Sequence, residues 1–369
     1  MDITAIITGI HYCSDCCQKD LKKLQFDDFD ANTMPTRCVL KGSKFTYAIS
    51  KWVSPKRTRS YPYERVYDTL ASSNKCITII PIIKDEGIGG DRDYLQWDTV
   101  SLMSLFDVFV ILAHYTDAEK NKRKENKITN QQFDNDYIKR KVEEISQFRS
   151  SALHWNLKEM EKTLPELIGK VKSDYSKIGK KLNVEFHSEE GIERFKEKIS
   201  EGLEKFKEFS RAKAQEAQNR EQQTEQPKEA LSTLSKATIT INNYLGGEYY
   251  LTTDEIKVEN STLFLIEGKH TATNNLPSLG DIKDGLLKMI LYTNIENVKA
   301  GGQEFNTIPI VKLTSEKISG RISSSASDSE IESFLSKNSF STREVKIVNE
   351  LFQEAEKNNF IAIIEWATT

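Results

Sequence analysis

Two carboxylates and one ammonium group are expected to meet at the end of a predicted β-hairpin. The first strand of this hairpin, Tyr249–Val258, is rich in aromatic and β-branched residues and carries Asp254. The second strand, Thr262–Ile266, is continuously apolar and is followed at once by Glu267 and Lys269. Acidic oxygens beside a lysine suit phosphodiester chemistry that depends on a divalent metal ion.

The Glu-x-Lys spacing by itself carries little information, because it recurs along the chain. The other acid-x-Lys triplets are Asp20–Lys22, Glu125–Lys127, Glu255–Lys257, Asp281–Lys283 and Glu344–Lys346. The triplet Glu267–Lys269 differs from these because it ends an apolar run and has an acid on its expected partner strand. The alternative interpretation is a surface ion pair at the end of a strand.

The sequence leaves open which acid of the first strand faces Glu267. Neighbouring residues of a strand point to opposite faces, so only one of Asp254 and Glu255 can lie beside Glu267. If the turn is centred between residues 259 and 260, residue 254 pairs with residue 265. A rise of about 3.3 Å per residue then brings Asp254 within reach of Glu267.

The order of elements around the hairpin resembles that of the PD-(D/E)XK nuclease superfamily. We expect a helix, a strand, the hairpin, a second helix over Asp281–Thr293 and a strand over Thr307–Leu313. The residues that match the superfamily motif are Asp254, Glu267, Gly268 and Lys269, and the resemblance covers residues 228–314. Thr253 departs from the motif, which often has proline at that position.

The resemblance implies a metal-dependent mechanism. Asp254 and Glu267 would hold Mg²⁺, helped by the carbonyl oxygen of Gly268, because Mg²⁺ prefers hard oxygen ligands. Lys269 would orient or deprotonate the attacking water and stabilise charge on the scissile phosphate. The predicted catalytic residues are therefore Asp254, Glu267 and Lys269.

Within the superfamily, the chain looks most like a type II restriction endonuclease. It combines one nuclease core with a large additional region and has no recognisable ATPase motif. The resemblance then implies a homodimer that cuts double-stranded DNA at a specific sequence. A repair or recombination nuclease of the same fold and a non-catalytic DNA-binding protein are the alternatives.

A basic stretch over residues 37–65 is the predicted DNA contact. It alternates lysines and arginines with aromatic residues, and Lys56, Arg57 and Arg59 fall between two prolines, where a loop is expected. Such a loop can hold phosphates and stack on bases. The alternative is an ordinary solvated surface loop.

We expect an α/β (α+β) protein with a restriction-endonuclease-like mixed sheet flanked by helices. The predicted segments are an N-terminal α/β region over residues 1–120, a helical region over residues 121–226 and the nuclease core over residues 227–369. The helical region carries apolar stripes within 136–206 that could form a dimer face. A single helix is expected over Asp136–Met160, and an exposed connection over Ala118–Lys127.

Composition places the chain among ordinary soluble proteins, with 38% hydrophobic and 29% charged residues and a net charge of −3. No apolar run approaches the roughly 18 residues of a membrane span, and a cytoplasmic location is expected. The odd count of five cysteines fits a reducing compartment. Two local clusters could bind metal instead of the hairpin, although we favour ordinary roles for both. They are His11, Cys13, Cys16 and Cys17, and the acidic loop with Asp85, Glu86, Asp91 and Asp93.

Overall fold

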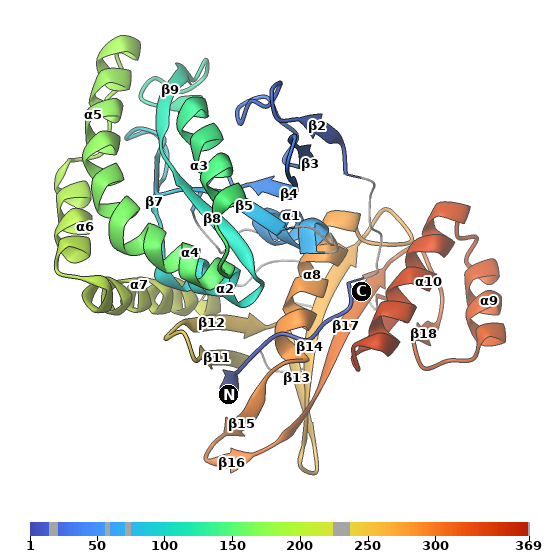
Figure 1. Cartoon of the computed structure of the whole chain (residues 1–369). Helices are drawn as coiled ribbons and strands as arrows, with labels where there is room; N and C mark the ends of the chain where they lie inside the picture. Colours follow the sequence, from blue (N-terminus) through green and yellow to red (C-terminus); the bar gives the residue numbers. More distant parts are fainter. Residues whose placement is uncertain (15–20, 56–59, 71–74, 224–236, 368–369) are drawn as a thin grey trace. The chain divides into compact units, whose positions relative to one another are not determined.

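The computed structural model describes residues 1–14, 21–55, 60–70, 75–223 and 237–367 (Figure 1). It is a mixed α/β structure with several sheets, as expected for the α+β class. The chain divides into two compact units: unit 1 contains Met1–Lys19 and Lys213–Thr369, and unit 2 contains Asp20–Ala212. In the described residues, no helix is long and apolar enough to cross a membrane.

Unit 1 contains two five-stranded sheets. One has the strand order β12-β11-β1-β15-β16, and the other has the order β13-β14-β17-β19-β18. The strands are β1 (Asp2–Ile7), β11 (Ala237–Asn243), β12 (Glu248–Thr253), β13 (Glu255–Glu259), β14 (Thr262–Thr271), β15 (Glu296–Ala300), β16 (Gln303–Glu304), β17 (Asn306–Ser315), β18 (Arg321–Ser323) and β19 (Ile361–Trp366). The helices are α8 (Leu279–Tyr292), α9 (Asp328–Lys337) and α10 (Thr342–Lys357).

Unit 1 includes the N-terminal strand, so the two units differ from the three segments expected from the sequence. Strand β1 pairs in parallel with β11 and antiparallel with β15. The chain after β1 continues along the same unit, where Tyr12 donates to Glu354 (2.7 Å) and the Cys13 amide donates to Asn358 (2.7 Å). The first residues therefore complete the C-terminal unit, because β1 fills the centre of a sheet whose other strands come from residues 237–304.

The predicted hairpin differs from the expectation at its first strand. Residues 249–258 form two strands, β12 and β13, which belong to different sheets. The chain leaves the first sheet at Thr253 and enters the second at Glu255, so Asp254 lies at the crossing point. A sequence pattern shows that both segments are extended, but the choice of partner strand depends on tertiary contacts.

The second strand of the hairpin is longer than expected. Strand β14 runs to Thr271, so Glu267 and Lys269 lie inside the strand instead of after its end. Glu255 pairs with Ile266, which shifts the register by two residues from the expected pairing of 254 with 265. A shift by two keeps every side chain on its expected face.

Helix α8 and strand β17 agree with the helix and the strand expected over residues 281–293 and 307–313, whereas β15 and β16 between them were not expected. The Ser278 side chain accepts a hydrogen bond from the Asp281 amide and caps α8. The chain then returns in β17, which lies parallel to β14, and β19 lies parallel to β17. Figure 1 shows α8 along β14 and β17, which it contacts directly. These elements place one face of β14 against the helix.

Unit 2 is built on a five-stranded sheet with the order β2-β3-β4-β5-β8 and two small antiparallel pairs, β6-β7 and β9-β10. The strands are β2 (Lys23–Gln25), β3 (Arg37–Lys41), β4 (Thr46–Lys51), β5 (Lys75–Pro81), β6 (Ile83–Asp85), β7 (Arg92–Tyr94), β8 (Val108–Ala113), β9 (Tyr115–Lys120) and β10 (Ile128–Phe133). The helices are α1 (Ser60–Leu70), α2 (Trp97–Leu105), α3 (Asn135–Gln147), α4 (Ala152–Lys158), α5 (Leu164–Leu182), α6 (Glu190–Ser200) and α7 (Leu203–Gln223), which extends past the boundary of the unit.

One expectation for unit 2 was wrong, and another was correct only in part. The helix expected over residues 136–160 is broken between α3 and α4, where Phe148 takes an extended conformation (φ −78°, ψ 121°), and a π-helical turn follows at Glu159–Thr163. Of the exposed connection expected over residues 118–127, residues 118–120 form the end of β9, which pairs with β10, and residues 121–127 form the connection between these two strands. In addition, α3 and α4 contact β8, so these helices share a unit with the N-terminal strands instead of forming a separate region.

Candidate active site

Helix α8 presents two charged residues to β14. Asp284 and Lys288 lie four residues apart and therefore share one face of the helix. The helix approaches the strand closely at Gly285, where an added Cβ would lie 3.3 Å from Val311 and 3.5 Å from the side chain of Lys269. The glycine thus leaves room for the side chains that β14 sends toward the helix.

Glu267 is the centre of this contact. Its side chain is 1% exposed, and each carboxylate oxygen meets an ammonium group. The Nζ atom of Lys269 lies 2.9 Å from Oε1, and the Nζ atom of Lys288 lies 2.8 Å from Oε2. Lys269 also contacts Asp284, with 2.6 Å between Nζ and Oδ2. Each lysine is therefore held against at least one carboxylate in a nearly dry environment.

The ion pairs decide the charge states of these groups. Burial would raise the pKa of Glu267, but the two ammonium groups overcome this effect and lower the pKa below its usual value. Burial would likewise lower the pKa of Lys269, but Glu267 and Asp284 raise it above its usual value. The pKa of Lys288 is raised in the same way, chiefly by Glu267. Glu267 is thus an anion and both lysines are cations at neutral pH.

Asp254 lies on the Glu267 side of the sheet, which answers the question that the sequence left open. Its Oδ2 atom accepts a hydrogen bond from the Gly268 amide at 2.8 Å. Glu255 pairs instead with Lys312, whose partner in the sheet register is Gly268. Of the two adjacent acids, Asp254 can therefore share a ligand with Glu267.

The surroundings of Asp254 disfavour the charged form of its carboxyl group. Burial first, and then the negative charge of Glu267, raise the pKa of Asp254 to about 6. Among the residues that the structure describes, no donor contacts the Oδ1 atom of Asp254. Among these five side chains, Asp254, Glu267 and Asp284 supply three carboxylates and Lys269 and Lys288 two ammonium groups, which leaves one negative charge uncompensated when Asp254 is ionised.

This arrangement fits a divalent cation such as Mg²⁺. In the described part of the chain, no group of three or more His, Cys, Asp or Glu side chains is placed to hold a metal. Mg²⁺, however, keeps several waters and is usually bound through one or two carboxylates. Asp254 supplies an oxygen without a donor, and Glu267 adds lone pairs beside it. A cation there would also relieve the repulsion that raises the pKa of Asp254.

Sequence reasoning brought Asp254, Glu267, Gly268 and Lys269 together correctly, but it missed Asp284 and Lys288. Both lie in a helix whose other residues are largely buried and apolar, namely Ile282, Leu286, Leu287, Met289, Ile290 and Leu291. The signal that could have found them is this pair of opposite charges at i and i+4 within an apolar helix that directly follows the Glu-x-Lys strand.

Some basic residues of the predicted DNA contact, residues 37–65, are less exposed to solvent than its composition suggested. Arg37 pairs with Glu64 (2.9 Å) and with Asp68, and Lys51 is 92% buried. Both side chains therefore serve contacts within unit 2. Lys56, Arg57 and Arg59, the residues predicted to bind DNA, lie outside the described residues.

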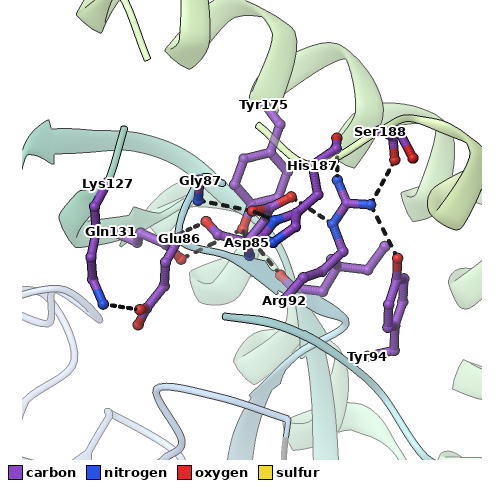
Figure 2. Close-up of polar contacts among 11 residues, drawn as sticks. Asp85, Glu86, Gly87, Arg92, Tyr94, Lys127, Gln131, Tyr175, His187 and Ser188 are labelled. Atoms are coloured by element: carbon purple, nitrogen blue, oxygen red, sulfur yellow. Dashed lines mark hydrogen bonds and ion pairs between the residues drawn. The ribbon is translucent and has the colours of Figure 1, made fainter. Parts of the chain in front are cut away.

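The rival acidic loop of unit 2 is a structural cluster (Figure 2). The buried Asp85 carboxylate accepts from Arg92 (2.6 Å) and from the Gly87 amide (2.9 Å), and it lies 2.8 Å from Nδ1 of His187. Asp93 accepts from the Ser54 hydroxyl at 2.6 Å. These carboxylates hold the β6-β7 turn in place, so their oxygens are occupied by protein donors.

The cysteines that the structure describes give no second candidate. Cys38 and Cys76 are buried free thiols, and burial raises their pKa values to about 11 and about 12. Cys16 and Cys17 lie outside the described residues. The hairpin of β13 and β14 with helix α8 therefore remains the candidate active site. No protein-family model, curated protein or solved structure matches this chain.

Proposed function

We propose that this protein is a Mg²⁺-dependent endonuclease that cuts double-stranded DNA at a specific sequence, as a homodimer in the manner of type II restriction enzymes. The observation that supports the proposal is the meeting of Asp254, Glu267 and Lys269 at the β13-β14 hairpin, with Nζ of Lys269 2.9 Å from Glu267. The accompanying helix and parallel strand agree with the resemblance to the PD-(D/E)XK superfamily.

Each residue has a distinct role in this proposal. Asp254 and Glu267 hold Mg²⁺, which supplies positive charge at the scissile phosphate and the leaving oxygen. Lys269 is kept as an ammonium ion by Glu267 and Asp284, so it is suited to bind the phosphate and orient the attacking water. Lys288 neutralises Glu267 from the helix side and keeps that carboxylate in place.

A cleavage assay with sequenced ends tests this function. Plasmid and phage DNA are incubated with the protein in Mg²⁺ or in EDTA, and the ends of the products are sequenced. We expect discrete fragments with a common end sequence that disappear in EDTA. Lys269→Met should slow cleavage by about 10²- to 10⁴-fold because it removes a charge at the reacting phosphate. Uniform smears or cutting only at unusual DNA structures would instead favour a repair nuclease.

Asp284→Asn tests how Lys269 is positioned. The substitution keeps an oxygen near Nζ but removes one of the two charges that hold the ammonium group. We expect cleavage to slow by about tenfold, a smaller effect than that of Lys269→Met, since one charge-assisted hydrogen bond contributes about 1.5–3 kcal/mol. Asp281→Asn, an exposed acid in the first turn of the same helix, is the matched control. Equal rates for Asp284→Asn and wild type would show that Asp284 does not position Lys269.

A further inference from the structure

The main sheet of unit 2 repeats the connections of the hairpin sheet in unit 1. In unit 1, the antiparallel pair β13-β14 is followed by α8 and by two further strands, β17 and β19, each parallel to the one before. In unit 2, the antiparallel pair β3-β4 is followed by α1 and by β5 and β8, again each parallel to the one before. Four consecutive strands thus correspond, β13-β14-β17-β19 and β3-β4-β5-β8, whereas the fifth strand lies at opposite edges of the two sheets.

This correspondence identifies the residues of unit 2 at the positions equivalent to Asp254 and Glu267. Asp254 directly precedes β13, and the register of β13 with β14 places it opposite Glu267. Thr36 directly precedes β3, and the register of β3 with β4 places it opposite Lys51. The Lys51 amide donates to the Thr36 carbonyl at 3.0 Å, which supports this pairing. A buried cation thus occupies the position that a buried anion has in unit 1.

Lys51 is a buried ammonium group with spare hydrogen-bonding capacity. It is 8% exposed, and its Nζ atom donates to the carbonyl oxygens of Ala31 (2.6 Å) and Asn32 (3.0 Å). An ammonium group has three donors, so one proton has no acceptor among the described residues. Within the same residues, no carboxylate lies within 4.0 Å of this nitrogen. Burial, and next the charge of Arg65, lower the pKa of Lys51.

A cavity adjoins Lys51. Its volume is about 220 Å³, and it is lined by Lys51, Lys84, Glu86, Tyr115, Asn130 and Gln131, among others. At about 30 Å³ per water molecule, it has room for several waters but is smaller than the roughly 300–1,000 Å³ of most ligand pockets. The cavity therefore suits a small ion or a single phosphate group better than a whole nucleotide.

The charges around the cavity favour an anion. Glu86 is already paired with Lys84 (2.7 Å) and with Lys127 (2.5 Å), and Figure 2 shows the contact with Lys127. Burial would raise the pKa of Glu86, but hydrogen bonds from Lys127 and Lys84 lower it to about 2. The negative charge of Glu86 is thus compensated by other lysines. Lys51 feels the nearby charges of Arg65 and Asp30, which act in opposite directions, but it forms no ion pair with a carboxylate among the described residues.

We propose that this cavity in unit 2 binds a phosphate group through Lys51. The group is either a phosphate of the DNA or a free phosphate, since both present the same oxygens to an ammonium ion. This second site needs no divalent metal ion and no cleavage, so the proposal is independent of the proposed nuclease activity.

Titration with inorganic phosphate tests the site directly. The full-length protein in EDTA is titrated with phosphate by calorimetry, with chloride keeping the ionic strength constant. We expect saturable binding that Lys51→Gln weakens by about tenfold or more, because glutamine can still donate to the two carbonyls but carries no charge. Lys162→Gln removes an exposed lysine of the same unit, outside the basic stretch 37–65, and should leave the affinity unchanged. Absence of saturable binding, or equal affinity in Lys51→Gln, would overturn the proposal.

A second variant tests the cavity without changing Lys51, so the proposal can be tested even if Lys51→Gln does not fold. The side chain of Lys84 is 20% exposed, and Lys84→Gln leaves the wall behind Lys51 unchanged. We expect this variant to weaken phosphate binding by about threefold, because Glu86 then loses one of its two cations. Unchanged phosphate affinity in Lys84→Gln would count against the cavity as the site.

DNA binding in EDTA identifies the source of the phosphate. A preference for 5′-phosphorylated duplexes that is lost in Lys51→Gln assigns the site to a DNA end. A weaker affinity of Lys51→Gln for closed circular DNA, with a salt slope reduced by about one, assigns it to the DNA backbone. Loss of phosphate binding without any change in DNA binding assigns it to free phosphate.

Discussion

Asp254→Asn is expected to abolish cleavage and, at the same time, to stabilise the metal-free protein. The substitution removes one of the two carboxylates proposed to hold Mg²⁺, and we expect cleavage to fall by about 10³-fold or more, as when several kcal/mol of transition-state stabilisation are lost. The asparagine oxygen can still accept from the Gly268 amide, so the local backbone should not change.

The stabilising effect follows from the raised pKa of Asp254. Its pKa is about 6 in the folded protein, compared with about 3.9 for an unperturbed aspartate. Protonation therefore favours the folded state. This contribution is complete below about pH 4 and is lost as the pH rises through 6. Well above pH 6 the charged Asp254 costs about 3 kcal/mol in the absence of metal, at about 1.4 kcal/mol per unit of pKa shift.

Urea unfolding in EDTA measures this effect. At pH 8, Asp254→Asn should raise the free energy of unfolding by about 3 kcal/mol relative to wild type, and the difference should shrink toward zero near pH 4. Mg²⁺ should stabilise wild type more than the variant, because ligands that bind the folded state stabilise it. A variant that is less stable than wild type at pH 8 would show that burial and the charge of Glu267 do not destabilise the ionised Asp254.

Glu267→Gln is expected to have the opposite effect on stability. Glu267 is the carboxylate shared by Lys269 and Lys288, and its loss leaves Lys288 without a strong partner. Removing one partner of a buried ion pair costs about 3–5 kcal/mol. We therefore expect a loss of that size in urea unfolding at pH 7.

Two further variants make this prediction specific. Glu255→Gln removes the neighbouring acid of the same hairpin, which is also largely buried but pairs with one lysine, Lys312, instead of two. Its loss should therefore cost less, about 2 kcal/mol. Adding Lys288→Met to Glu267→Gln removes the unpaired charge and should recover part of the stability. Similar losses for Glu267→Gln and Glu255→Gln, or no recovery in the double variant, would contradict the buried ion-pair account.

The sequence predicted the local elements of the site better than their partners. The apolar run before Glu267 correctly predicted the start of β14, and the helix expected over Asp281–Thr293 agrees with α8, because buried strands and amphipathic helices leave local patterns. The break at Asp254 left no such pattern. Thr253 and Glu255 are both in extended strands, and only the tertiary structure shows that these strands belong to different sheets.

Charged residues were the hardest to interpret from the sequence. Arg37 and Lys51 counted toward a basic surface, yet one is held by Glu64 and Asp68 and the other is buried. Lys288 likewise looks in the sequence like an ordinary exposed lysine of a helix, whereas in the structure its Nζ atom lies 2.8 Å from Glu267. Composition records the charges of these residues, but their partners come from distant parts of the chain.

Cleavage of one plasmid by wild type and by Asp254→Asn, in Mg²⁺ and in EDTA, tests the central claim most directly. The account predicts discrete products from wild type in Mg²⁺ and no detectable products from wild type in EDTA or from the variant in either condition. Equal cleavage by the two proteins, or no cleavage by wild type with Mg²⁺ or Mn²⁺, would contradict the assignment of Asp254, Glu267 and Lys269 as a nuclease site.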